Sequence, residues 1–257
     1  MRYYLGVDIG GSNVKMVLVR KDGTRKGATI VFKTPRQKKR LLKTLTAHLK
    51  KFIAENAVEG IGVGVPGIVE PKKGILVNAP NLPFLNGWNV KNFFRKFSLP
   101  VRVDNDSRCF LRAEARYGVG RGYRHIAVLT IGTGIGGGLL IDGKMYFGSR
   151  SGAGEFGHMV VNQGKTLEQL AGKKAYLKHG DRSEVVGIGV ANIVNAFDPE
   201  IIILGGGGIF GSTLRISKIR SVAKKYVSSP LGKKTRIMKG KLREYAGAIG
   251  ATLLFKN

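Results

Sequence analysis

One pattern occurs twice in this chain: a buried strand, a glycine-rich turn and a second apolar strand. The first copy covers residues 5–15 (LGVDIGGSNVK), and the second covers residues 128–138 (VLTIGTGIGGG), roughly 120 residues further on. Strands and helices are expected after each copy, so the repeat predicts two related α/β lobes. The cleft between two such lobes is where we expect a ligand to bind.

The remaining elements follow from apolar spacing and from turn residues. We expect strands at 3–9, 14–20, 28–32, 60–65, 75–77, 101–103, 126–131, 135–141, 200–204 and 236–238. We expect helices over 89–97, 107–117, 184–197, 217–227 and 244–254, and an amphipathic helix that starts at Thr34-Pro35. In that last helix Thr34 is expected to be the N-cap. The predicted domains are residues 1–104, joined by a C-terminal helix at about 244–257, and residues 105–243.

Glycine content and charge are both unusual. The 257 residues include 38 glycines, and 44 Lys and Arg against 16 Asp and Glu give a formal net charge of +28. Such a surface favours polyanions, which include nucleic acid, acidic membranes, nucleotides and polyphosphate. The lysines are spread along the whole chain, so a general lysine bias that keeps the protein soluble is an equal alternative.

Cysteine and targeting patterns narrow the class of protein. Cys109 is the only cysteine, so neither an internal disulfide nor a thiolate metal site is expected. No signal pattern precedes the first strand, and no apolar run approaches the length of a membrane span. We therefore expect a cytoplasmic protein with no membrane partner.

The pattern G-x-G-x-x-G occurs at residues 62–67, 132–137 and 206–211. A dinucleotide fold needs a helix directly after such a turn and an acidic residue about 20 positions later. The first two occurrences lack the helix, and the third lacks the acid. An NAD site is not expected.

The two hairpin turns suit phosphate in a different way. Successive backbone N–H groups in a tight turn can form a concave anion site, and glycine permits the unusual dihedrals and the close approach. Asp8 ends the first strand beside the first turn, where a carboxylate can hold Mg²⁺ directly or through water. Lys15 can offset phosphate charge.

Six segments occur in the order seen in ROK-family sugar kinases, and together they cover nearly the whole chain. They are residues 7–15 (VDIGGSNVK), 64–67 (GVPG), 103–106 (VDND), 129–138 (LTIGTGIGGG), 152–158 (GAGEFGH) and 203–207 (ILGGG). The chain thus resembles glucokinase-like members of this family. The resemblance implies the actin-like ATPase fold, with two lobes of ribonuclease-H type and ATP in a central cleft. It also implies a homodimer. Members of the family phosphorylate glucose and related hexoses, or act as sugar-responsive repressors.

The resemblance assigns roles residue by residue. ATP and Mg²⁺ are implied as cofactors, with Asp8 at the metal and Asp106 as the general base. The phosphates and the adenosine are assigned to Asp8, Gly10, Gly11, Ser12, Lys15, Gly132, Thr133, Gly134, Gly136, Gly205, Gly206 and Gly207. The hexose is assigned to Asn81, Asn105, Glu155, His158 and Glu168.

Several of these residues also have simpler explanations. Asp104 or Asp106 can cap the helix that follows, and His158 can be a structural histidine. Glu168 lies inside a capping box, Thr166-Leu-Glu-Gln169, where an acid needs no sugar. A carboxylate near the accepting hydroxyl is nevertheless what phosphoryl transfer requires of a base, which favours a catalytic Asp106.

The chain departs from the family after His158, where most members carry cysteines that bind structural zinc. Residues 160–169 (VVNQGKTLEQ) contain none, so no zinc site is expected. Short members without zinc include polyphosphate-dependent glucokinases, which the charge of +28 makes a reasonable alternative. A non-catalytic sugar-sensing regulator and a weak nucleic-acid binder are alternatives of a different class. Sequence-specific DNA binding is not expected, because the first phosphate motif starts within the first ten residues.

Overall fold

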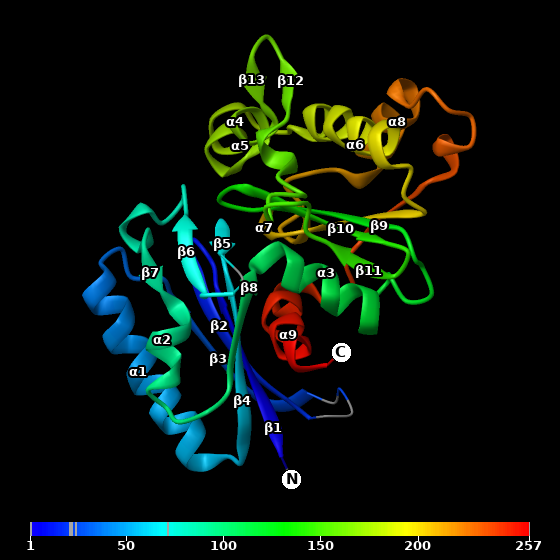
Figure 1. The fold of residues 1–257 in the computed structure, drawn as a ribbon. Coiled ribbons are helices and arrows are strands. Elements are labelled where there is room, and N and C mark those ends of the chain that lie inside the picture. The colour runs from blue at the N-terminus through cyan, green and yellow to red at the C-terminus, as the bar shows by residue number, and fades with distance from the viewer. Residues whose placement is uncertain (1, 21–22, 24, 71, 257) are drawn as a thin grey trace. The chain divides into compact units, whose positions relative to one another are not determined.

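The computed structural model describes residues 2–20, 23, 25–70 and 72–256, and the chain forms two compact units (Figure 1). Unit 1 consists of Met1–Ala113 with Tyr245–Asn257, and unit 2 consists of Glu114–Glu244. The predicted boundary after residue 104 falls nine residues earlier than this division. The C-terminal segment joins the first unit.

Unit 1 is built on a five-stranded sheet in the order β3-β2-β1-β4-β8. Its strands are β1 (Tyr3–Ile9), β2 (Asn13–Arg20), β3 (Arg25–Lys33), β4 (Val58–Val65) and β8 (Val101–Asn105). The first three strands are antiparallel neighbours, and β4 and β8 run parallel to β1. A small sheet is added by β5 (Ile68–Glu70), β6 (Ile75–Asn78) and β7 (Trp88–Asn89). Because β1, β4 and β8 are parallel, their carboxyl ends meet at one edge of the five-stranded sheet.

Helices cover both faces of this sheet (Figure 1). They are α1 (Lys38–Glu55), α2 (Val90–Arg95), α3 (Asp106–Tyr117) and α9 (Ala246–Thr252). Leu41, Leu45 and Leu49 of α1 are fully buried in the same cluster as Leu5 and Val7 of β1. Because strand residues alternate between faces, the positions between these β1 residues face α9 instead.

Glycines allow α9 to lie directly on the sheet. A Cβ added at Gly6 of β1 would overlap the Ala248 carbonyl oxygen, and one at Gly62 of β4 would overlap that of Ala251. Gly62 begins the first G-x-G-x-x-G pattern, and its role here is close packing against a helix rather than nucleotide binding.

Unit 2 repeats the arrangement of unit 1, with a five-stranded sheet in the order β11-β10-β9-β14-β15. The strands are β9 (Ile126–Ile131), β10 (Ile135–Ile141), β11 (Lys144–Tyr146), β14 (Ile201–Gly205) and β15 (Arg236–Lys239). Again an antiparallel hairpin precedes two parallel strands. Both sheets thus share one strand order, as the duplicated hairpin predicts.

The helices of unit 2 are α4 (Leu167–Ala171), α5 (Lys173–His179), α6 (Ser183–Phe197), α7 (Gly207–Phe210) and α8 (Ile216–Tyr226). Helices α6 and α8 lie together on one face of the sheet (Figure 1), where Val190 and Ile219 join Leu129 and Ile202 in the core. A short hairpin, β12 (Val160–Asn162) and β13 (Lys165–Thr166), turns through Gln163 and Gly164, both with positive φ. It occupies the segment in which zinc-bearing relatives were expected to carry cysteines.

One helix start was predicted wrongly. Helix α1 begins at Lys38 with Gln37 as its N-cap, not at Thr34. The Thr34 hydroxyl instead donates to the Gly10 carbonyl at 2.7 Å, and its backbone N–H donates to the Ser12 carbonyl at 2.9 Å. The Thr34 side chain, which the local pattern assigned to a helix cap, therefore contacts a residue 24 positions earlier in the sequence. Within the described part of the chain, no helix has the length and apolar character needed to cross a bilayer.

Candidate active site

In unit 1 the candidate residues gather where the parallel strands end. Asp8 of β1 pairs in register with Gly64 of β4, and Gly64 pairs with Asp104 of β8. A Cβ at Gly64 would lie 3.5 Å from the Asp106 Cα, an ordinary van der Waals distance, so the start of α3 lies directly against β4. Asp8 and Asp106 are thereby brought to the same edge.

The half-buried Asp8 carboxylate lies against the first turn of α9. A Cβ on Gly247 would lie 2.6 Å from the Asp8 Oδ2 atom. Burial raises the pKa of Asp8 from 3.8 to about 6, and the opposing attraction comes from Lys15, its neighbour across the hairpin. Among the described residues, none donates a hydrogen bond to this carboxylate. A carboxylate with no hydrogen-bond donor fits a hydrated Mg²⁺, for which oxygen ligands are preferred.

The first glycine turn is closed by local hydrogen bonds. The Gly10 N–H donates to the Asn13 carbonyl at 2.9 Å, and Thr34 fixes both Gly10 and Ser12 from outside. The expected unusual dihedrals are not seen at either hairpin turn. Of the glycines assigned to phosphate or adenosine, only Gly206 has a positive φ, at 85°.

Asn105, rather than an aspartate, caps α3. Its Oδ1 accepts hydrogen bonds from the backbone N–H groups of Ser107 (2.9 Å) and Arg108 (3.1 Å). Its Nδ2 donates to the Gly67 carbonyl at 3.0 Å. The half-buried Asp106 is the first residue of the helix, and its Oδ1 accepts from the Ser107 N–H at 2.7 Å. Asp106 is thus not needed as the cap.

Asp104 is part of a buried ion-pair network and is not a cap. Its carboxylate lies 2.7 Å from Arg108 Nε and 3.1 Å from Arg112 Nη2. Its side chain is 7% exposed and that of Arg108 is 4% exposed, so removing the carboxylate would leave a buried guanidinium without its charge partner. The expectation that Asp104 caps the helix is therefore wrong.

Asn81 lies in a loop connected to the Asn105 side chain through Gly67. A Cβ at Gly67, which has φ of 89°, would overlap the Asn78 carbonyl oxygen. The loop after β6 therefore packs against the residue that accepts the Asn105 amide hydrogen bond. The backbone that leads into the Asn81 loop and the Asn105 side chain thus both contact Gly67.

In unit 2 the segment that carries Glu155 and His158 packs on the second glycine hairpin. A Cβ at Gly157 would overlap the Ile135 carbonyl, and one at Gly137 would overlap the Phe156 ring and the Gly154 carbonyl. The His158 Nε2 and Glu155 Oε2 atoms are 3.8 Å apart, and both side chains are well exposed. The geometry presents a carboxylate and an imidazole together, both able to reach a polar ligand.

Glu168 lies in the first turn of α4, just after the Thr166 cap, and it also contacts the second glycine hairpin. The Thr166 and Gln169 side chains form the predicted capping box of α4. The Glu168 Oε2 accepts a hydrogen bond from the Ile135 N–H at 2.6 Å. One carboxylate oxygen of Glu168 therefore fixes the strand that follows the second glycine turn.

The second turn and the third glycine loop are adjacent. The Gly132 N–H donates to the Gly134 carbonyl at 2.8 Å, and the Lys173 N–H donates to the Gly132 carbonyl at 3.1 Å. A Cβ at Gly206 would overlap the Ile131 carbonyl, whereas one at Gly207 would meet only open space. Gly205 ends β14, so the loop follows a strand directly. Sequence reasoning missed Lys173 and Thr34, because both contacts use groups that no motif marks.

No three His, Cys, Asp or Glu side chains of the described residues gather as a metal site. Cys109 is buried in α3, outside the hairpin that follows His158.

The fold is that of the actin-like ATPase class. The ROK family model matches residues 4–182 and 165–257, so the chain belongs to the ROK family. It is 32% identical to a beta-glucoside kinase of Listeria monocytogenes over 78% of this chain and 81% of that protein. It is also 28% identical to a xylose repressor of Caldicellulosiruptor bescii, over 85% of this chain and 69% of that protein.

Solved structures confirm the predicted fold. A ROK family glucokinase from Streptomyces griseus, in complex with glucose and AMPPNP, superposes with a TM-score of 0.86 at 24% identity and 98% coverage of both chains. An inorganic polyphosphate/ATP-glucomannokinase from an Arthrobacter strain superposes with a TM-score of 0.79 at 28% identity, covering 99% of this chain and 98% of that one.

Proposed function

We propose that this protein is an ATP-dependent hexose kinase that phosphorylates glucose or a related hexose or N-acetylhexosamine. The observation that carries the proposal is the position of Asp106. Its half-buried carboxylate begins α3 at the strand edge that also holds Asp8, while the neighbouring Asn105 performs the capping. A carboxylate at such a strand edge is suited to proton transfer.

Each group then has a defined task. Asp106 orients the accepting sugar hydroxyl and takes its proton, and the Asn105 amide and the Asn81 loop hold the same sugar. Glu155 and His158 contact further hydroxyls through their exposed polar atoms. Backbone N–H groups of the glycine turns stabilise phosphate oxygens, with help from Lys15. When bound, ATP with Mg²⁺ would supply the phosphoryl group, and Asp8 would hold the metal directly or through water.

ATP is proposed over polyphosphate because of the third glycine loop. Gly206 adopts a left-handed conformation against Ile131, which leaves open space at Gly207 after the end of β14. A linear phosphate chain has no adenosine and would make no use of such a loop. The 28% identical glucomannokinase, whose name includes both donors, supports polyphosphate as the second candidate.

A coupled assay tests the proposal. Glucose, N-acetylglucosamine, N-acetylmannosamine and fructose are each offered with ATP–Mg²⁺ and, separately, with polyphosphate. We expect sugar-dependent ADP formation and a higher kcat/KM with ATP. A higher kcat/KM with polyphosphate would overturn the choice of donor. Sugar binding with no turnover by either donor would identify a sugar-sensing regulator, as the relationship to a repressor also allows.

A further inference from the structure

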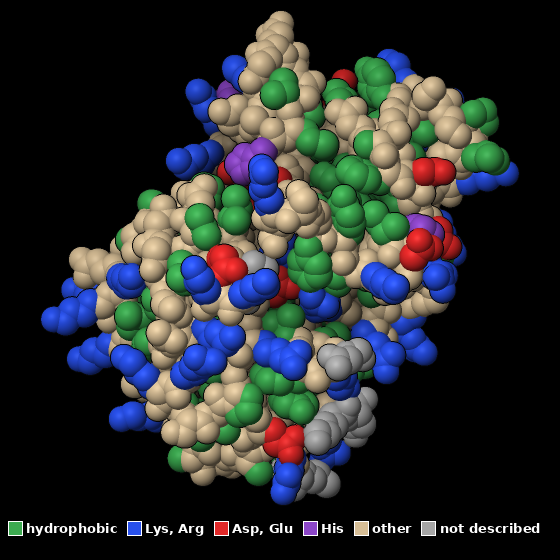
Figure 2. All heavy atoms as spheres, in the orientation of Figure 1, with side chains coloured by type: hydrophobic (Ala, Val, Ile, Leu, Met, Phe, Trp, Pro, Cys, Tyr) green, Lys and Arg blue, Asp and Glu red, His purple; other side chains and the backbone are tan. Residues whose placement is uncertain are grey.

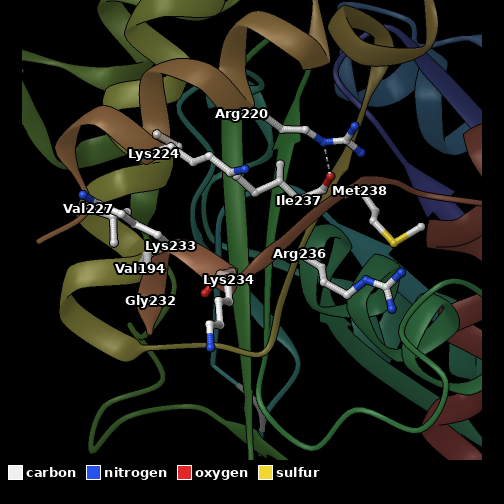
Figure 3. A pocket seen from close by; sticks show the side chains of 12 residues that line it. Val194, Arg220, Lys224, Val227, Gly232, Lys233, Lys234, Arg236, Ile237 and Met238 are labelled. Atoms are coloured by element: carbon white, nitrogen blue, oxygen red, sulfur yellow. Dashed lines mark hydrogen bonds between the residues drawn. The ribbon is translucent and has the colours of Figure 1, made fainter. Parts of the chain in front are cut away.

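Unit 2 contains a groove that the proposed kinase reaction does not use. It lies between the second half of α8, the turn after it and β15, with Val194 of α6 at its base, and its volume is about 420 Å³ (Figure 3). None of the residues assigned to nucleotide, metal or sugar lines it. Strand β15 is at the edge of its sheet, so one side of its backbone faces this groove.

The groove is strongly basic. Five cationic side chains line it, contributed by α8, the turn and the strand: Arg220, Lys224, Lys233, Lys234 and Arg236. All five are exposed, and no Asp or Glu is among the lining residues. In the described part of the chain, none of these five side chains takes part in an ion pair. Positive charge is thus concentrated here without local compensation.

Cations also occur elsewhere on the surface. Figure 2 shows Lys and Arg side chains spread over much of the visible face, several of them next to one another. A general lysine bias explains such a spread, but it does not explain five cations around one hollow. Lysines also protect an edge strand from pairing with another chain, but that role needs no hollow and no arginine.

Neutral partners fix the two arginines in place. The Arg220 Nε donates to the Ile237 carbonyl of β15 at 2.7 Å, as the dashed line in Figure 3 shows. The Arg236 Nη1 donates to the Tyr123 hydroxyl at 2.8 Å. Because these partners are uncharged, they do not compensate the positive charge of either guanidinium. Each guanidinium also retains further N–H groups that can bind a ligand. Arginine held in this way suits bidentate recognition of phosphate.

Apart from Gly232 and Thr235, the rest of the lining consists of apolar side chains, including Val194, Ala223 and Val227. Low-dielectric walls concentrate the field of the surrounding cations and strengthen attraction for an anion. No aromatic side chain lines the groove, whereas proteins that bind single-stranded nucleic acid use aromatic rings to stack the bases. The lining therefore favours a ligand made of phosphate alone.

We propose that this groove is a binding site for a linear inorganic phosphate chain, separate from the site of sugar phosphorylation. The chain's oxygens bind the guanidiniums of Arg220 and Arg236, and the ammonium groups of Lys224, Lys233 and Lys234 neutralise further phosphates. The proposal does not depend on which donor the kinase uses, since the two sites share no residue.

Binding is tested with fluorescently labelled long-chain polyphosphate and the intact protein, by anisotropy at several salt concentrations. The double variant Lys224→Gln/Lys234→Gln removes two cations that make no hydrogen bond among the described residues, so folding should be preserved. The control, Lys144→Gln/Lys178→Gln, removes the same charge from exposed positions on β11 and α5. Loss of two phosphate contacts should lower affinity roughly tenfold and reduce its salt dependence, while the control should change it less than about twofold.

Equal losses for the two double variants would show that only net charge matters and would overturn the proposal. Absence of polyphosphate binding by the unmodified protein would do the same. Tighter groove-dependent binding of duplex or single-stranded nucleic acid would assign the groove to that ligand instead. ATP-dependent sugar phosphorylation by the groove variant serves as a check on folding and is expected to equal that of the control.

Discussion

Replacing Asp8 by asparagine should make the protein more stable and less active. Burial raises the pKa of the Asp8 carboxyl from 3.8 to about 6, so the folded protein holds this proton to higher pH than the unfolded chain does. The stability contributed by Asp8 is therefore complete below pH 3.8 and is lost as pH rises through 6. At about 1.4 kcal/mol for each unit of pKa, ionised Asp8 costs the folded state at most about 3 kcal/mol above that pH.

The carboxamide keeps the shape of the side chain without its charge. Asp8→Asn should raise the free energy of unfolding at pH 8 by about 1–3 kcal/mol, since the half-exposed site screens part of the cost. At pH 4 the folded protein already holds the proton, and the two proteins should differ by less than about 0.5 kcal/mol. ATP-dependent turnover at pH 8 should fall, because the neutral amide is a poor partner for a hydrated Mg²⁺.

Denaturant unfolding of the ligand-free proteins at both pH values measures the difference. Asp142→Asn, at an aspartate whose side chain is 67% exposed, is the control and should leave the unfolding free energy unchanged within about 0.5 kcal/mol. A lower unfolding free energy for Asp8→Asn at pH 8, or an equal gain at both pH values, would refute the reasoning.

Three further predictions concern packing, charge and metal. Asp104→Asn should destabilise the protein by about 3–5 kcal/mol in denaturant unfolding, because Arg108 stays buried; the exposed Glu184→Gln should cost under about 1 kcal/mol. Gly62→Ala should lower the melting temperature through a loss of about 1–3 kcal/mol or more, since its Cβ overlaps α9, whereas Gly152→Ala, which faces open space, should be neutral. Elemental analysis should find no stoichiometric zinc, and about one zinc per chain would contradict the assignment.

The sequence predicts the strands well because their apolar runs and glycine turns are local signals. The duplicated hairpin predicts two related lobes, and the two five-stranded sheets do share one strand order. The structural role of a particular glycine is harder to predict from the sequence. Gly62 makes room for Ala251, a residue nearly 190 positions later. No local pattern records such a contact.

Polar residues near the site show the same limit. The tripeptide Asp104-Asn105-Asp106 offers three caps, and the sequence cannot tell that Asn105 is used while Asp104 pairs with two arginines. Thr34-Pro35 suits a helix start equally well in isolation, yet the fold brings Thr34 to the first glycine turn. The cations of the groove in unit 2 come from α8, the turn after it and β15, and only the fold brings them together.

The most direct test of the proposed function is the turnover of Asp106→Asn. Asparagine keeps the shape and can still hydrogen-bond, but it cannot take a proton from the sugar. The kcat for the best hexose with ATP–Mg²⁺ should therefore fall by roughly 10²–10⁴, with little change in nucleotide affinity. Asp142→Asn should retain full activity and is the control; Asp104→Asn is unsuitable for this purpose because Asp104 is needed for stability. Near-wild-type turnover for folded Asp106→Asn would contradict the assignment of Asp106 as the catalytic base.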